Sequence, residues 1–379
     1  MKIVHIITRL EFGGTWEVLL PLLEGARHAG HDVSLILAPT PSTQVQLQSF
    51  CDHHGIHFIW QEELTRQVSP MRDFKAWRAL VRSIKALRPD VVHTHTSKAG
   101  FLGRLAAKWA GVPRVVHSTH GHVFSGYFGP VTTAFYMGLE RLAAGWCDRI
   151  IVLSRHEIED HLKRGIGSRD QLVAIPNGID LHRFSDVKSD PLPLRRAMGM
   201  GEGDVLCAVI GRLVPVKGHE VFLKAFKIVR EKAAHAHAVI IGDGELKERL
   251  RQMSVELGLG NAVSWLGHRD DIPQLLRAVD IVVQPSLNEG FGLAVVEAQA
   301  AGRPVVATRV GGLPEAVKEG ETALLVPPND PEALARAMLE LMKDPARRET
   351  MGRQGQEWVR ERFTIERMIN DTLRLYESV

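Results

Sequence analysis

Short apolar runs rich in β-branched residues alternate with amphipathic helical stretches along the whole chain. This alternation is typical of parallel sheets that helices cover on both faces. The runs are too numerous for one open sheet, so the pattern predicts an α/β fold with two Rossmann-like domains. The predicted strands are Ile3–Ile7, Val33–Leu37, Val91–His95, Val115–Ser118, Ile150–Leu153, Val205–Ile210, Ala238–Ile241, Val263–Leu266, Ile281–Val283, Val305–Ala307 and Ala323–Val326.

A turn-rich stretch without a clear strand separates the two series of strands. It contains Ser185–Pro193 and Met198–Gly203, in which proline and glycine interrupt the pattern. A chain of 379 residues is also too long for one ordinary core. We therefore predict a first domain at residues 1–185, a linker at 186–202 and a second domain at 203–362.

Composition describes a globular protein, with 45% hydrophobic and 24% charged residues. A net charge of +3 is too small to indicate a nucleic-acid partner. The three cysteines, Cys51, Cys147 and Cys207, form no C-x-x-C pair and are expected to be reduced thiols. The first residues already form a predicted strand, and no apolar run reaches about 18 residues. These features predict a cytoplasmic protein.

The stretch Gln284–Glu297 connects a buried strand to a helix and combines two carboxylates with two glycines. The glycines allow positive φ and let a ligand approach the backbone amides. The N–H groups at the start of the helix favour an anion, and the carboxylates can hold sugar hydroxyls on either side of a phosphate. An ordinary strand–turn–helix unit would look the same in isolation. The candidate residues are Glu289, Gly290, Phe291, Gly292, Leu293 and Glu297.

Two cations, Arg212 and Lys217, flank the turn that follows strand Val205–Ile210. Together they can neutralise a diphosphate, the guanidinium as a fork and the lysine as a point charge. Lys217 opens the next helix, where a cation is unfavourable without an anionic partner, and this favours a functional role. The sequence contains no Asp-x-Asp with which a metal could grip a diphosphate. We therefore predict that the site uses these cations and no metal.

Two more turns of the second half are candidates for contacts with a nucleotide. Gly242 follows strand Ala238–Ile241, and His268 and Arg269 follow strand Val263–Leu266. Backbone groups in these turns can lie along the edge of a nucleobase, and the Arg269 guanidinium can stack on it.

In the first half, Gly13 and Gly14 lie between a strand and a helix and can bring backbone amides against a phosphate or sugar. A tight turn is the plainer explanation. Neither a G-x-G-x-x-G nor a G-x-x-x-x-G-K-[ST] motif is present.

Polar residues also follow two central strands of this half, at the edge where open α/β sheets bind ligands. His95, Ser97 and Lys98, at the end of strand Val91–His95 and just after it, are the candidates for acceptor binding. Ser97 is also expected to cap a helix, and Lys98 is a candidate for an acceptor phosphate or, equally, a solvated lysine. His120 follows strand Val115–Ser118 directly, so its position favours it over His122.

Residues 66–88 combine basic and apolar side chains at helical spacing, and Val123–Pro130 is rich in aromatics and glycine. The first is a surface helix packed on a sheet, which is compatible with contact to anionic lipid headgroups. The second is a loop over the site or one that faces an apolar partner.

Four motifs, in this order, resemble glycosyltransferase family 4: Gly13-Gly14, Pro176–Asp180, Gly211–Gly218 and Asn288–Glu297. The resemblance covers nearly the whole chain. It implies the retaining GT-B fold, in which two Rossmann-like domains face a central cleft. The first domain would hold the acceptor and the second a nucleotide sugar, with the last helix, 363–379, crossing back. The segment His93–Gly100 is similar to members that build bacterial exopolysaccharide, capsule or O-antigen on lipid carriers.

The resemblance also implies a role for each candidate residue. Arg212 and Lys217 would bind the diphosphate of a nucleotide sugar, most commonly UDP, and stabilise the leaving group. Glu297 would hold the ribose. Glu289 and the backbone amides of residues 290–293 would bind the donor sugar and the phosphate. Gly13 and Gly14 would close on the diphosphate. His120 would touch the donor sugar. No residue is an obvious covalent nucleophile, which favours a front-face substitution.

Three alternatives remain. A non-catalytic nucleotide-sugar binding protein would keep the glycine loops and lose Arg212, Lys217 or Glu289, whereas all three are present. An NAD-dependent oxidoreductase would need the missing dinucleotide motif. A GT-B synthase with a soluble acceptor is closer. The basic helix and the aromatic loop favour a lipid-linked acceptor and a peripheral protein on the inner face of the membrane.

Overall fold

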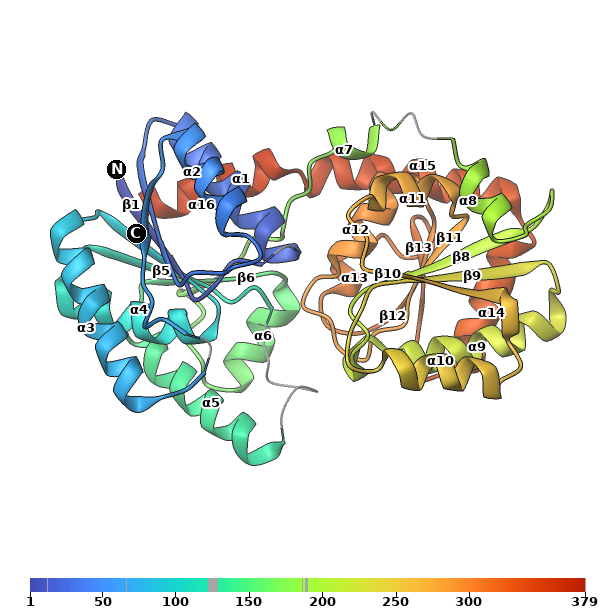
Figure 1. The fold of residues 1–379 in the computed structure, drawn as a ribbon, viewed down its shortest axis with the longest axis horizontal. Helices are drawn as coiled ribbons and strands as arrows, with labels where there is room; N and C mark the ends of the chain where they lie inside the picture. The colour runs from blue at the N-terminus through green and yellow to red at the C-terminus, as the bar shows by residue number, and fades with distance from the viewer. Residues whose placement is uncertain (12, 66, 122–128, 186, 188–189, 379) are drawn as a thin grey trace. The chain divides into compact units, whose positions relative to one another are not determined.

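The computed structural model describes residues 1–11, 13–65, 67–121, 129–185, 187 and 190–378. The chain forms two compact units (Figure 1). The first unit comprises Met1–Gly178 together with Ile365–Val379, and the second comprises Ile179–Thr364. Each unit has its own parallel sheet, so the predicted fold class, an α/β protein with two Rossmann-like domains, is confirmed.

Within its described residues, the first unit contains a seven-stranded sheet in the order β3-β2-β1-β4-β5-β6-β7, and each neighbouring pair is parallel. The strands are β1 (Lys2–Ile7), β2 (Asp32–Leu37), β3 (His57–Trp60), β4 (Val91–His95), β5 (Arg114–Ser118), β6 (Arg149–Val152) and β7 (Leu172–Ala174). The helices are α1 (Gly14–His28), α2 (Gln44–His54), α3 (Pro70–Leu87), α4 (Ser97–Ala110), α5 (Pro130–Ala144), α6 (Arg155–Lys163) and α16 (Ile365–Glu377).

The two faces of this sheet pack on different helices, because side chains alternate along each strand. Ile3 and Ile7 of β1 belong to the core formed with α1 and α16, and Val4 and Ile6 belong to the core formed with α3 and α4 (Figure 1). His5 lies between Ile3 and Ile7 and is fully buried. The face beneath α1 and α16 therefore carries a polar side chain in the middle of an apolar core.

The second unit contains, within its described residues, a six-stranded parallel sheet in the order β10-β9-β8-β11-β12-β13. Its strands are β8 (Val205–Ile210), β9 (Ala236–Ile241), β10 (Val263–Gly267), β11 (Ile281–Gln284), β12 (Val305–Thr308) and β13 (Ala323–Val326). Its α-helices are α7 (His182–Ser185), α8 (Leu192–Ala197), α9 (His219–Lys232), α10 (Lys247–Glu256), α11 (Ile272–Ala278), α12 (Leu293–Ala300), α13 (Leu313–Ala316), α14 (Pro331–Met342) and α15 (Pro345–Arg362). Helices α9, α10 and α14 cover one face of the sheet, and α11 and α12 cover the other (Figure 1).

Every predicted strand is present, within two residues at its ends. The prediction missed β3 and β7, which are the two edge strands of the first sheet. Leu172–Ala174 is only three residues long, and His57–Trp60 is half-buried to exposed. Short or partly exposed segments of this kind give a weaker signal than central parallel strands, which are buried on both faces.

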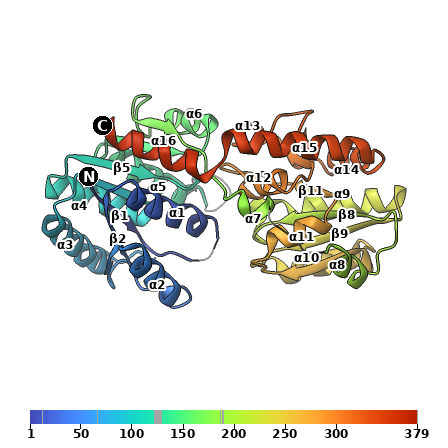
Figure 2. The same ribbon diagram turned by 90° about the horizontal axis from the view of Figure 1, so that it is seen from above.

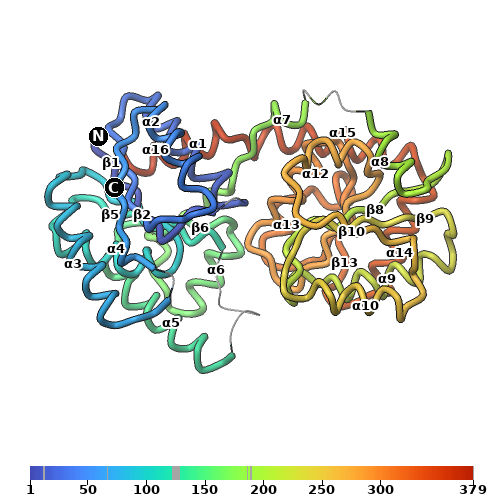
Figure 3. The backbone as a smooth tube through the Cα atoms, in the orientation of Figure 1, coloured from blue at the N-terminus to red at the C-terminus, as the bar shows by residue number. Residues whose placement is uncertain are grey.

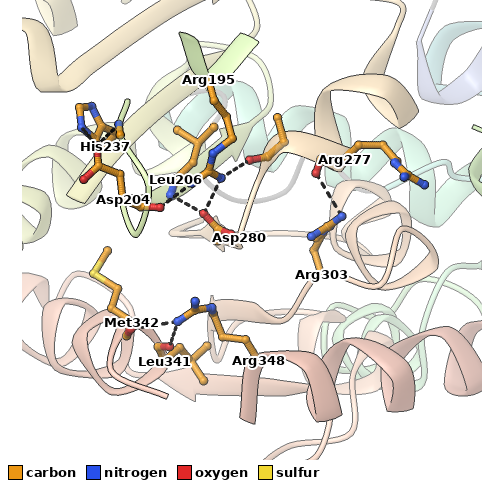
Figure 4. Close-up of polar contacts among 12 residues, drawn as sticks. Arg195, Asp204, Leu206, His237, Arg277, Asp280, Arg303, Leu341, Met342 and Arg348 are labelled. Carbon is orange, nitrogen blue, oxygen red and sulfur yellow. Dashed lines mark hydrogen bonds and ion pairs between the residues drawn. The ribbon is translucent and has the colours of Figure 1, made fainter. Parts of the chain in front are cut away.

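The described residues of the turn-rich segment predicted as a linker, 187 and 190–202, belong to the second unit. Within it, α8 is held by Arg195, whose Nη1 donates to the Ala278 carbonyl and to Asp280 Oδ2, both at 2.9 Å. Asp280 Oδ2 also accepts the Leu206 N–H at 2.7 Å, so one carboxylate joins α8 to the starts of β8 and β11 (Figure 4).

The chain returns to the first unit at Ile365, and its last helix, α16, packs beside α1 (Figures 2 and 3). The approach is close: a Cβ added at Gly25 of α1 would lie 2.7 Å from Ile369 Cδ1 of α16. Tyr376 of α16 is fully buried against the sheet. No helix within the described part of the chain is both long enough and apolar enough to cross a membrane.

Candidate active site

The strand orders give each unit one point at which the connections diverge to opposite sides of the sheet. These points lie between β1 and β4 in the first unit and between β8 and β11 in the second. Open α/β sheets bind ligands outside the carboxyl ends of the strands at such a point. The predicted residues Gly13 and His95 lie at the first, and Arg212, Lys217 and Glu289 lie at the second.

In the second unit, Lys217 and Glu289 form an ion pair. Lys217 ends the short 3₁₀ helix Pro215–Lys217 after β8, and Glu289 lies in the loop after β11. Lys217 Nζ is 2.6 Å from Glu289 Oε2, and the two side chains are only 18% and 14% exposed. The lysine at the start of α9 therefore has the anionic partner that its position demands.

A small polar network holds Glu289 in place. Glu289 Oε2 accepts from Ser286 Oγ at 3.2 Å and from Gln284 Nε2 at 3.3 Å. The Thr308 hydroxyl, at the end of β12, donates to the Ser286 carbonyl at 2.5 Å. Sequence reasoning missed Gln284, Ser286 and Thr308 as supporting residues. The signal was available, because polar residues that directly follow buried strands of one sheet meet at the same edge.

The Glu289 loop is also held by backbone contacts that only glycine permits. Gly311 has φ 51°, and a Cβ there would lie 1.8 Å from the Glu289 carbonyl oxygen. A Cβ on Gly312 would lie 2.1 Å from the Gly290 oxygen, and the Gly312 N–H donates to the Glu289 carbonyl at 3.0 Å. Gly218 approaches the Pro285 carbonyl in the same way. The position of the carboxylate is therefore fixed by both its side-chain partners and its backbone.

The other predicted donor residues of this loop differ in exposure. Gly292, with φ 89°, caps α12 without a side-chain hydrogen bond, and Leu293 is the first helical residue. Phe291 is 3% exposed and packs edge-on against Phe363, with ring centroids 5.1 Å apart. The Phe291 side chain is thus packed in the core, and Glu297 on α12 is also buried, with 8% of its surface exposed.

Arg212 is exposed and has no ion pair or side-chain hydrogen bond with another described residue. His268 and Arg269 are also exposed, but they face Asp270 at 3.2 Å and Asp271 at 2.6 Å respectively. The side-chain hydrogen bond to Asp271 raises the pKa of Arg269. Arg212 is therefore the better placed of the two guanidinium groups to meet an anion.

Gly242 is a further predicted donor residue. A Cβ there would lie 2.0 Å from the Gly211 carbonyl oxygen. Glycine at this position lets the turn after β9 lie directly against the turn after β8, which carries Arg212.

In the first unit, Gly13 caps α1 with φ 126°, and Gly14 begins the helix. A Cβ added at Gly13 would meet no atom within 4 Å. The prediction that Ser97 caps α4 is wrong. Thr96 occupies the capping position with φ 63° and no side-chain cap, and the Ala99 N–H bonds instead to the Thr8 hydroxyl at 3.2 Å.

Lys98, predicted to hold an acceptor phosphate, pairs with Asp73 of α3. Its Nζ lies 2.6 Å from Asp73 Oδ1 and also donates to the Gln67 carbonyl. In this structure Lys98 ties α4 to α3.

His120 follows β5 in the left-handed region, with φ 52°. Its Nε2 lies 2.8 Å from Nδ1 of His95, which is only 1% exposed. Burial lowers the pKa of His120 to about 4, and it lowers the pKa of His95 well below its usual value. His95, predicted to bind the acceptor, therefore contacts its neighbours in the core. His5 and His93, which sequence reasoning did not single out, lie beside it.

The basic segment predicted at 66–88 is α3, which begins at Pro70. Ala76, Ala79, Leu80 and Ile84 are buried against the unit, whereas Phe74 is 55% exposed. The exposed basic side chains are Arg72, Lys75, Arg78, Arg82, Lys85 and Arg88. Arg66, His122 and most of the loop Val123–Pro130 lie outside the described residues.

Two family models match the chain. Glycosyl transferases group 1 matches residues 194–358, and Glycosyltransferase Family 4 matches residues 12–183. A UDP-Gal:alpha-D-GlcNAc-diphosphoundecaprenol alpha-1,3-galactosyltransferase of Escherichia coli is 31% identical over 338 residues, which cover 86% of this chain and 87% of that enzyme. A D-inositol 3-phosphate glycosyltransferase of Salinispora tropica is 32% identical over 308 residues, or 76% of this chain and 63% of that enzyme.

Solved structures show the same fold. HepE of Anabaena in complex with UDP-glucose gives a TM-score of 0.84 at 24% identity, with both chains fully covered. Sucrose-phosphate synthase of Thermosynechococcus elongatus gives 0.81 at 24% identity, covering 100% of this chain and 99% of that one. The chain belongs to the group 1, family 4 glycosyltransferases and has the GT-B fold. It is thus an enzyme that acts on a nucleotide-sugar donor.

Proposed function

We propose that this enzyme transfers a sugar from a UDP-sugar, with retention of configuration, to a hydroxyl of a lipid-linked glycan in the synthesis of a cell-surface polysaccharide. The observation that carries the proposal is the Lys217–Glu289 pair at the switch point of the second sheet. The name of the Escherichia coli relative, which specifies a UDP-linked donor and a diphosphoundecaprenol-linked acceptor, supports this choice of substrates.

The donor diphosphate would bind in the second unit, between two cations and a helix start. The Arg212 guanidinium is exposed and unpaired among the described residues, and Lys217 follows five residues later, at the end of the 3₁₀ helix Pro215–Lys217. The N–H groups at the start of α12 add the positive end of a helix dipole. We propose that these groups bind the diphosphate without a metal ion. In this proposal Glu297 binds the ribose, and Gly242, His268 and Arg269 bind the base.

Glu289 would position the donor sugar while its partner receives the leaving group. Its carboxylate lies 2.6 Å from Lys217 Nζ, so a sugar contact at Glu289 would be linked to a phosphate contact at Lys217. As the bond from the anomeric carbon to the phosphate breaks, negative charge grows on the diphosphate next to Arg212 and Lys217. Preorganised cations lower the barrier most at such a place.

The acceptor hydroxyl would attack the anomeric carbon on the face from which UDP departs, so no covalent enzyme intermediate is needed. In this proposal the first unit supplies the acceptor side, with His95, Ser97 and Lys98 near the acceptor, and His120 contacts the donor sugar. Gly13 and Gly14, at the start of α1, would close on the diphosphate through their backbone amides.

Helix α3 would bring the enzyme to the inner face of the membrane, where such an acceptor resides. Its basic side chains are exposed together with Phe74 and Met71, which are 55% and 75% exposed. Basic residues beside exposed apolar ones bind anionic lipid surfaces. Sedimentation with vesicles that contain phosphatidylglycerol should deplete the wild type, and Arg78→Glu combined with Arg82→Glu should prevent this. Equal binding of that variant would remove α3 from the proposal.

The decisive experiment offers each UDP-hexose with a synthetic GlcNAc-diphosphate lipid and, in parallel, with free sugars and sugar phosphates. The product is isolated and its new anomeric centre is assigned by NMR. An α-linked product from an α-linked donor, formed on the lipid acceptor alone, is the expected result. An inverted linkage would refute retention, and transfer to a free sugar alone would favour a synthase with a soluble acceptor.

A further inference from the structure

We propose that His95 and His5 are positioning residues that fix the tautomer and orientation of the His120 imidazole through a continuous series of hydrogen bonds. The proposal rests on the function proposed above only in that His120 meets the donor sugar. The series of hydrogen-bonded histidines lies wholly within the first unit. It consists of His5 on β1, His95 at the end of β4 and His120 after β5.

The geometry is that of a continuous chain of imidazoles. His5 Nδ1 lies 3.0 Å from His95 Nε2, and His95 Nδ1 lies 2.8 Å from His120 Nε2. The planes of the first two rings differ by only 10°. His5 and His95 are 0% and 1% exposed, so water does not compete for these contacts. Strands β1 and β4 are neighbours in the sheet, which is what brings the rings together.

The number of ring protons determines the direction in which the hydrogen bonds between these imidazoles run. Burial favours the neutral imidazole and lowers the pKa of His5 to about 3 and that of His120 to about 4. A neutral imidazole has one N–H and one lone pair. His95 must therefore donate to one neighbour and accept from the other, and both hydrogen bonds must run in the same direction. Only two arrangements of the whole chain exist.

The outer nitrogen of His5 decides between them. His5 Nε2 is buried and has no hydrogen-bond partner among the described residues. If the chain ran from His120 to His5, this nitrogen would carry a proton, and a buried N–H without an acceptor is costly. If it runs from His5 to His120, only a lone pair is left there. We therefore assign His5 Nδ1–H to His95 Nε2, and His95 Nδ1–H to His120 Nε2.

The consequence lies at the far end of the chain. With Nε2 of His120 accepting, its single proton is on Nδ1, so His120 presents an N–H donor and not a lone pair to a sugar hydroxyl. The φ of 52° is a left-handed backbone conformation that few non-glycine residues adopt. Among the described residues, the hydrogen bond from His95 is the contact that fixes the tautomer and the direction of the His120 ring.

A second, separate chain in the same core provides the control. His93 Nδ1 lies 2.6 Å from Tyr376 Oη, and His93 Nε2 lies 2.8 Å from Ser118 Oγ. Both nitrogens of His93 are thus engaged away from His120, although its ring packs against His95 with centroids 4.1 Å apart. Tyr376→Phe should disturb this core without changing the tautomer of His120.

The test reads the tautomer directly from the intact enzyme. Protein labelled with ¹⁵N in its histidines gives ring nitrogen shifts and couplings that distinguish Nδ1–H from Nε2–H, and the His120 signals are assigned by their loss in His120→Asn. We expect Nδ1–H at both His120 and His95. An Nε2–H tautomer at His120 in the wild type would overturn the proposal. So would a stoichiometric metal in the purified protein, because nitrogen atoms of His5, His93 and His95 lie within 4.8 Å of one another, and a metal-bound nitrogen carries no proton.

Two amide substitutions separate positioning from simple packing. In His95→Asn the side-chain amide occupies the place of Nδ1 and can still donate to His120, whereas in His95→Gln it occupies the place of Nε2 and reaches only His5. We expect His95→Gln to lower kcat/KM about 3- to 10-fold and to shift the His120 ring signals. His95→Asn should leave the His120 ring signals in the Nδ1–H form, because its amide can still donate to His120 Nε2. Equal effects of the two substitutions on the His120 signals would refute the relay.

Failure of this inference is distinguishable from failure of the proposed function. If His120→Asn kept full activity, the role of His120 in transfer would be wrong, while the tautomer measurement would still decide the relay. If the tautomer were Nε2–H while His120→Asn abolished transfer, the relay would be wrong and the role of His120 would stand.

Discussion

Replacing Lys217 with methionine keeps the length of the side chain and removes its charge. The change breaks the Lys217–Glu289 ion pair, so we expect it to affect both folding stability and catalysis. Breaking a fully buried ion pair from one side costs about 3–5 kcal/mol, and an exposed pair contributes about 1 kcal/mol or less. This pair is 18% and 14% exposed, and Glu289 keeps Ser286 and Gln284 as partners. We therefore expect the free energy of unfolding to fall by about 1–3 kcal/mol.

Lys217→Met should also lower turnover, by a free energy similar to its effect on folding. A hydrogen bond to a charged group contributes about 1.5–3 kcal/mol, which corresponds to a loss of about 10- to 150-fold in kcat/KM. Urea denaturation and UDP release measure the two quantities. Arg309→Met is the control, because its ion pair with Glu319 is about half exposed and should contribute little. If Lys217→Met matched this control in both assays, the coupling of the pair to catalysis would be refuted.

Three further predictions follow from the packing and the buried histidines. Gly311→Ala forces a Cβ to within 1.8 Å of the Glu289 carbonyl oxygen, so we expect activity to fall together with about 1–3 kcal/mol of stability; normal transfer by this variant would show that the loop can move freely. Since burial lowers the pKa of His5 to about 3 and of His120 to about 4, these rings stay neutral in the folded state while the unfolded chain takes up protons near pH 6.5. Stability should thus be complete above about pH 6.5 and fall by about 1.4 kcal/mol per pH unit for each histidine toward pH 4; urea midpoints that do not change between pH 7.5 and pH 5 would contradict this. Tyr376→Phe leaves a buried imidazole nitrogen without its partner and should cost about 1–3 kcal/mol in urea denaturation, whereas an unchanged midpoint would mean that the hydrogen bond contributes nothing.

The sheets could be predicted from the sequence because their central strands are buried on both faces and therefore read as short apolar runs. The edge strands β3 and β7 were not predicted, because edge strands are less buried and their sequences therefore carry a weaker apolar pattern. The anchoring of residues 186–202 could not be predicted either. It depends on one arginine, Arg195, whose partner Asp280 is distant in sequence.

The location of Arg212, Lys217 and Glu289 at one edge of the second sheet could be predicted, because each follows the end of a strand that the sequence reveals. Their roles in donor binding stay predictions. The partners within the first unit could not be predicted. The sequence pattern suggests that Lys98 is an available cation, but in the folded unit Asp73 of α3 pairs with it. His5 and His93 read as polar interruptions of apolar strands, and only the register of β1 against β4 shows that they share a face. Ser97 does not cap α4, because Thr96 takes the capping position and the Thr8 hydroxyl, just after β1, accepts the Ala99 N–H.

The central claim, a cation-based site for a UDP-sugar in the second unit, is tested most directly by thermal unfolding with UDP, GDP, ADP and their sugars in the presence of EDTA. A ligand that binds only the folded protein stabilises it by about 2.7 kcal/mol at 100 times its Kd. We predict that UDP and one UDP-sugar raise the Tm of the wild type, that EDTA leaves this shift unchanged, and that Arg212→Ala abolishes it. No shift with any uridine nucleotide, or a shift that requires a divalent metal, would contradict the account.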